Sequence, residues 1–79
     1  MVEMVREHLA QAEEHVAQGE CHLAQQLEII GELERDSPDG RASIEMLKQL
    51  QQLQALHIFH RDRLRAELES LTNPARPTG

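Results

Sequence analysis

The chain has 79 residues and a formal net charge of −6, with one aromatic residue, Phe59, and one cysteine, Cys21. An acidic chain lacks the basic surface that general nucleic-acid binding requires, and no apolar stretch of about 18 residues could cross a membrane. A lone cysteine cannot form an intramolecular disulfide, and the N-terminus lacks the order of a signal peptide, so we expect a cytoplasmic protein. Abundant Leu, Ala, Glu, Gln and Arg favour an all-α fold.

The first predicted element is an amphipathic helix over about residues 2–34. Its apolar residues follow a heptad pattern, which predicts a coiled-coil-like seam. One row of this seam is Val2, Leu9, Val16, Leu23 and Ile30, and the companion row is Val5, Ala12, Gly19, Gln26 and Leu33. Gly19 has no side chain, so it either makes room for a bulky neighbour or kinks the helix. Cys21 falls on the outer side, where an exposed thiol is expected.

A turn at residues 35–37 and a second helix over about residues 38–72 complete the predicted domain, 1–73. Ser37 is the expected N-cap and Asp36 the alternative, because a side-chain oxygen can accept from an early amide and Pro38 has no N–H to lose. Asn73 should end the helix before Pro74, and residues 74–79 should form a flexible tail. The predicted seam rows are Leu50, His57, Leu64 and Leu71, and Met46, Leu53 and His60, with Leu68 at the flank.

The two helices should pair as an antiparallel hairpin. Counting outward from the turn brings Leu23 near Leu50 and Val16 near His57. The arginine-rich segment 61–65 then lies beside the acidic first half of the first helix, which favours this pairing. Two helices cannot cover an apolar stripe on all sides, so we predict that two hairpins dimerise into a four-helix bundle. The predicted dimer seam contains Leu9, Val16, Leu23, Leu50, Leu53 and Leu64.

The five histidines are regularly spaced. His8, His15 and His22 repeat every seven residues along the border of the first seam, and His57 and His60 share a face of the second helix. One interpretation is a polar layer that fixes the register, with the ring nitrogens bonded to Gln, Glu or water. The other is a site for Zn²⁺ or another divalent metal made by His57, His60 and His15. The first interpretation is favoured because carboxylate ligands are missing near the pair on the second helix.

The sequence contains no catalytic motif: it has neither a nucleophile elbow nor a phosphate-binding glycine loop. We therefore expect a protein that is not an enzyme and needs no cofactor, acting as a homodimeric interaction or structural protein with an unknown protein partner possible. A small metal- or pH-responsive module that uses the seam histidines is the alternative. Phe59 lies off the predicted seam, either as a secondary contact or as an isolated exposed apolar residue.

Two stretches of the chain resemble a family of short uncharacterised proteins of rhizobia and related proteobacteria. The first runs from Glu14 to Gln26 and continues through Ile30 to Asp36, and the second runs from His57 to Leu64 and ends in Arg-Asp-Arg-Leu. The resemblance covers roughly residues 12–68. It implies a bacterial helical hairpin and no particular chemistry. Cys21 stands where the family usually has arginine, and the Ser37-Pro38 helix start differs from the common turn.

Overall fold

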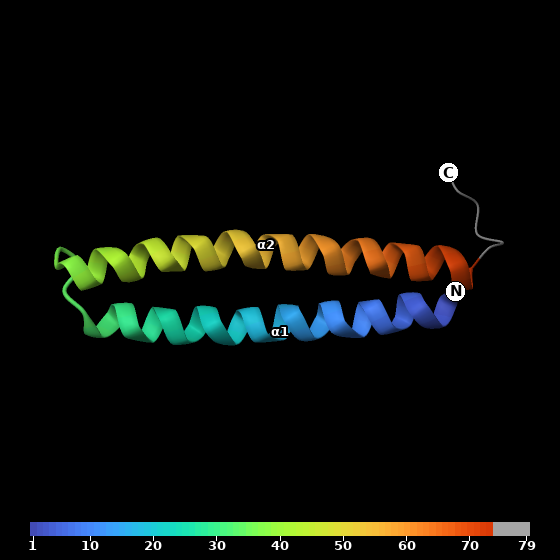
Figure 1. Ribbon diagram of the computed structural model, residues 1–79, viewed down its shortest axis with the longest axis horizontal. Helices are drawn as coiled ribbons and strands as arrows, with labels where there is room; N and C mark the ends of the chain where they lie inside the picture. The colour runs from blue at the N-terminus through green and yellow to red at the C-terminus, as the bar shows by residue number, and fades with distance from the viewer. Residues whose placement is uncertain (74–79) are drawn as a thin grey trace.

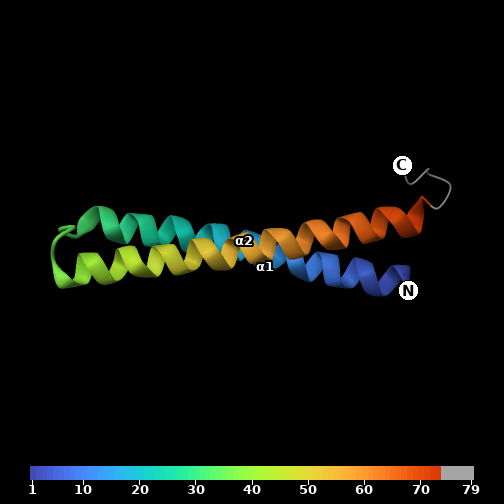
Figure 2. The same ribbon diagram turned by 90° about the horizontal axis from the view of Figure 1, so that it is seen from above.

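The computed structural model describes residues 1–73, which form two antiparallel α-helices and no strand. Helix α1 spans Val2–Glu32 and helix α2 spans Pro38–Thr72. The helices lie side by side (Figure 1) and cross near their mid-length when seen from above (Figure 2). We call the end with residues 33–37 the turn end and the other the open end. The predicted all-α hairpin is confirmed, whereas the predicted tail at 74–79 lies outside the described residues.

The turn is closed by hydrogen bonds around Ser37. The Ser37 hydroxyl accepts from the Gly40 N–H at 3.0 Å and donates to the Glu34 carbonyl at 2.6 Å. Ser37 is therefore the N-cap of α2, as predicted, and Pro38 follows at the first helical position. α1 ends two residues before the predicted limit because Leu33 adopts an extended conformation with φ −104° and ψ 149°. A Cβ at Gly40 would collide with the Glu34 carbonyl oxygen, so the turn needs glycine there.

The predicted seam of α1 is confirmed along its whole length. Every residue of its two rows is buried or half-buried. The deepest are Ala12, with 2% of its surface exposed, and Val16, with 4%. At the open end, Val5, Ala12 and Leu64 form an apolar cluster against which Leu9, Leu68 and Leu71 pack. This cluster is the main apolar core of the hairpin.

The predicted seam of α2 is half correct. The row Leu50, His57, Leu64 and Leu71 is buried or half-buried, but the companion row Met46, Leu53 and His60 is exposed. The observed companion row is Leu47, Gln54, Arg61 and Leu68. The predicted and the observed companion rows lie on opposite sides of the row that begins at Leu50. Apolar content alone favoured the wrong side. The polar Gln54 occupies the seam because its amide fills the space left by Gly19 and finds a backbone partner across the hairpin.

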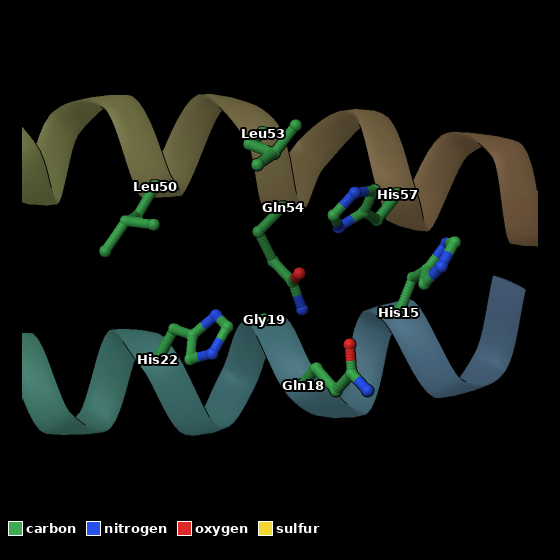
Figure 3. Close-up of a pocket in the computed structure, with 8 residues that line it drawn as sticks. All are labelled: His15, Gln18, Gly19, His22, Leu50, Leu53, Gln54 and His57. Carbon is green, nitrogen blue, oxygen red and sulfur yellow. The ribbon is translucent and has the colours of Figure 1, made fainter.

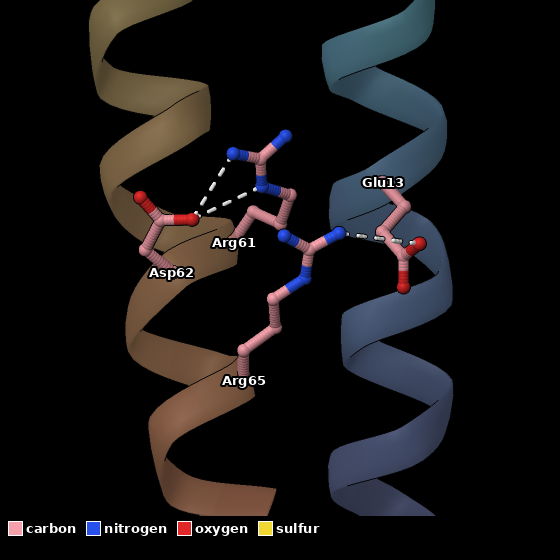
Figure 4. Close-up of polar contacts among 4 residues, drawn as sticks. All are labelled: Glu13, Arg61, Asp62 and Arg65. Carbon is pink, nitrogen blue, oxygen red and sulfur yellow. Dashed lines mark hydrogen bonds and ion pairs between the residues drawn. The ribbon is translucent and has the colours of Figure 1, made fainter.

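An ion pair joins the two helices on the side of α1 that carries Glu13. Arg65 of α2 lies 3.8 Å from the Glu13 carboxylate of α1, as the opposed charge pattern predicted, and Arg61 pairs with its neighbour Asp62 at 3.1 Å (Figure 4). Exposed pairs of this kind contribute about 0–1 kcal/mol each. Neither helix, within the described residues, is long and apolar enough to cross a membrane.

Candidate functional site

A shallow hollow of about 140 Å³ opens between the helices near their mid-length (Figure 3). Both helices contribute to its walls. The lining residues are His15, Gln18, Gly19 and His22 of α1 and Leu50, Leu53, Gln54 and His57 of α2. The hollow therefore combines aliphatic side chains with three imidazoles, and it contains no Asp, Glu, Lys or Arg.

The floor of the hollow is formed by a buried glutamine. Gln54 is only 6% exposed, and its Nε2 donates to the Val16 carbonyl at 2.9 Å. A Cβ on Gly19 would overlap the Gln54 amide, so the missing side chain of Gly19 is what admits it. Gln26 makes the reciprocal contact nearer the turn, donating from α1 to the Ser43 carbonyl of α2 at 2.9 Å. These two amides hold the helices in one axial register, because each donor reaches only one carbonyl.

The ring of His15 faces the ring of His57 across the hairpin. Their centroids are 5.5 Å apart and the planes are inclined by 37°. Figure 3 shows both imidazoles at the same end of the hollow, one from each helix. The prediction that His15 lies close to the α2 histidines is thus confirmed for His57.

Two buried polar atoms at the hollow have no hydrogen-bond partner among the described residues. They are Oε1 of Gln54 and Nδ1 of His57. A buried polar atom without a partner costs about 1–3 kcal/mol. Both atoms therefore lower the stability of the middle of the hairpin.

The predicted metal ligands are only partly assembled. His57 and His15 meet, whereas His60 lies in the exposed row with Leu53. Within residues 1–73, no group of three or more His, Cys, Asp or Glu is arranged to hold a metal ion. Structural zinc sites use four protein ligands, so one hairpin offers at most half of such a site.

The residues predicted to form the dimer seam divide into two sets. Val16 and Leu64 are buried within the single hairpin, and Leu9, Leu23 and Leu50 are half-buried in the same seam. Leu53 is 49% exposed and lines the hollow. Of the six residues, Leu53 has the most surface free for contact with another molecule.

The hollow is the centre of a longer surface that we call the histidine face. Its α1 row is His8, His15, His22 and Ile29, and its α2 row is Met46, Leu53 and His60. The outer neighbours are Gln11, Gln18 and Gln25 on α1 and Gln49 and Leu56 on α2. No Asp, Glu, Lys or Arg occurs in these rows, although such residues make up 28% of the chain. Charged residues begin at the next heptad positions beyond the rows, which are Glu32, Asp39, Arg63 and Glu67. The opposite side, which we call the carboxylate flank, carries Glu13, Glu20, Leu27, Glu34 and Arg65.

Sequence reasoning missed Gln54 as a structural residue and missed the histidine face as a unit. Gly19 in the seam was the available signal for Gln54, because a missing side chain predicts a large neighbour but does not identify it. The sequence groups His8, His15 and His22 on the first helix and His57 and His60 on the second. Which of the α2 histidines shares a face with the α1 histidines depends on the rotation of α2. Comparisons of the chain with protein-family models, curated proteins and solved structures found no match.

Proposed function

We propose that this protein is a non-enzymatic interaction protein that works as a homodimer of helical hairpins, packed as a four-helix bundle in a bacterial cytoplasm. The observation that carries the proposal is the large apolar surface that one hairpin leaves uncovered. Leu53, Leu56 and Met46 are 49%, 64% and 53% exposed. Exposed apolar side chains that lie together on one face mark an interaction site.

The thinness of the core supports the same proposal. The buried apolar residues of the hairpin are Val5, Ala12, Val16 and Leu64. Chains of this size often need an additional source of stability, and oligomerisation is one of the common ones. A second hairpin would cover apolar surface that the first leaves in water. The resemblance to the rhizobial hairpin family is consistent with this architecture, and we propose membership of that family as well.

Sedimentation velocity over a range of concentrations tests the dimer. At neutral pH we expect a particle of twice the 9.0 kDa chain mass, dissociating on dilution. Circular dichroism on the same samples reports the helix content. A chain that remains monomeric and fully helical at micromolar concentration would contradict the proposal.

A second candidate function rests on the His15–His57 pair. Two imidazoles whose ring centroids lie 5.5 Å apart could supply two ligands to Zn²⁺, and a second hairpin could supply the others. Isothermal titration calorimetry with Zn²⁺ should then give a stoichiometry of one ion per two chains, and His57→Gln should abolish the binding. His8→Gln is the matched control, because His8 is a histidine of the same face outside the pair. Equal binding by the two variants would exclude this site.

A further inference from the structure

We propose that the histidine face is where a second copy of this chain docks, and that protonation of its histidines releases that copy. This inference rests on the proposed homodimer and specifies both its surface and its control. The face is the surface defined above, centred on the hollow between His15 and His57. The occupant is a second hairpin, packed face to face with the first.

The charge distribution favours a second copy on this face. Each chain carries a formal charge of −6, so two copies repel each other wherever their charged surfaces meet. On the carboxylate flank, Glu13, Glu20 and Glu34 would approach the same residues of the other copy. The histidine face has no formal charge at neutral pH. It is therefore the surface along which two copies can pack without bringing charges of the same sign together.

The composition of the face suits an interface. Ile29, Met46, Leu53 and Leu56 are all at least 46% exposed on it or at its border. The hollow is lined by residues near the middle of both helices, so a two-fold axis through the centre brings the two hollows opposite each other. The buried Gln54 and His57 atoms then lie beneath the interface.

The same face changes its charge when the pH falls. Four of the five histidines, His8, His15, His22 and His60, lie on the face, and a protonated imidazole carries one positive charge. Acidification therefore replaces a neutral surface with four positive charges per chain. Residues three or four positions away are the neighbours on a helix surface. None of the five histidines has a carboxylate at that spacing, whereas His57 has Arg61 and His60 has Arg63.

Other charged groups near the histidines do not compensate for this charge. Glu7 and Glu14 adjoin histidines in the sequence, but consecutive helix residues point in different directions. The Asp62 carboxylate is paired with Arg61, and across the hairpin His15 meets another histidine, His57. Glu67 continues the α2 row one heptad beyond His60, at the open end. At the turn end, Asp39 and Glu32 likewise lie one heptad beyond Met46 and Gln25. Carboxylates confined to the two ends of the face leave the new charge at its centre unpaired.

Two electrostatic effects of acidification oppose each other, and the local one is the stronger. Protonation of all five histidines changes the chain from −6 to −1, which weakens the general repulsion between copies. The new charges, however, face each other across helices packed about 8–10 Å apart, within the Debye length of about 10 Å at 0.1 M salt. They must also lose water to enter the interface. The carboxylate flanks lie on the far sides, where salt screens them. Acid therefore separates the copies.

The test measures the dimer dissociation constant by sedimentation at about pH 8 and about pH 5.5, at one ionic strength, with helicity recorded in parallel. Leu53→Glu places a carboxylate on the histidine face, and Phe59→Glu places one at a position that is 62% exposed outside that face. At about pH 8 the first variant should weaken the dimer at least about a hundredfold and the second by less than about threefold. Equal weakening of the dimer by both variants, or weakening by Phe59→Glu alone, would overturn the assignment of the dimer interface to the histidine face. The proposed dimer itself would still stand.

The pH response has its own variant. His8, His15, His22 and His60 are exposed, so changing all four to Gln leaves the seam residue His57 in place. The dimer dissociation constant of the unmodified chain should be at least about tenfold higher at the lower pH. The quadruple variant should lose most of that difference. An unmodified dimer with the same dissociation constant at both pH values would overturn the release by protons. A helical monomer at about pH 8 would instead overturn the proposed dimer itself.

Discussion

The open end and the middle of the hairpin are held together by different means. At the open end, apolar side chains from both helices pack into the cluster around Ala12 and Leu64. In the middle, the contact between the helices consists of a glutamine amide in the space left by Gly19 and a pair of facing imidazoles. The comparison indicates that stability is concentrated at the open end. The middle contributes the register of the two helices and an uncharged outer surface of aliphatic side chains and imidazoles.

Truncating a side chain of the apolar cluster should lower the stability of the hairpin more than any other change proposed here. Leu64 is 7% exposed, and Leu64→Ala should lower the free energy of unfolding by about 2–5 kcal/mol through lost burial and a new cavity. Phe59→Ala removes a larger side chain that is 62% exposed, and it should change the free energy of unfolding by about 0.5 kcal/mol or less. Urea unfolding at one fixed protein concentration measures both. A similar loss in the two variants would show that the open end is not the main source of stability.

The middle is tested by adding one methyl group. Alanine favours a helix over glycine by about 1 kcal/mol, so Gly31→Ala, with open space around the position, should stabilise the protein by up to that amount. Gly19→Ala carries the same propensity gain, but its Cβ displaces the Gln54 amide from the Val16 carbonyl. Losing that buried hydrogen bond costs about 1–3 kcal/mol, so the net change should be destabilising by up to about 2 kcal/mol.

Thermal unfolding of the two glycine variants, side by side, gives the sign of each change. Opposite signs would establish that Gly19 is required by its neighbour on α2. If both variants were stabilised alike, the middle would have room for a side chain, and the interlock with Gln54 would have no energetic role.

The ion pair between the helices should contribute least to the free energy of unfolding. Arg65 and Glu13 are 53% and 49% exposed, and their nearest atoms are 3.8 Å apart. Glu13→Gln should therefore change the free energy of unfolding by less than about 1 kcal/mol, with the difference disappearing in high salt. Glu7→Gln is the control, since it removes a carboxylate from the same helix with no ion pair in the described structure. A salt-independent loss larger than that of Leu64→Ala would reverse the proposed ranking of the two regions.

Much of the fold could be predicted from the sequence because it depends on local signals. The heptad spacing of α1 identified every residue of its seam, and Ser37-Pro38 marked the start of α2 through cap chemistry that involves only neighbouring residues. The candidate site was less accessible. His15 and His57 were expected to be close, but Gln54 was not expected in the seam. Its place depends on Gly19, which is 35 positions earlier in the chain.

The sequence by itself determined that there are two helices, where they begin and end within a residue or two, and which side of α1 faces its partner. Only the tertiary structure decided the rotation of α2. Leu47, Gln54 and Arg61 repeat every seven residues in the same way as Met46, Leu53 and His60, and periodicity cannot distinguish two rows that flank the same stripe. The choice is made where the helices touch, because a glutamine amide fits beside Gly19 and reaches the Val16 carbonyl. That rotation turns Leu53 and His60 outward and gathers the histidines on one face.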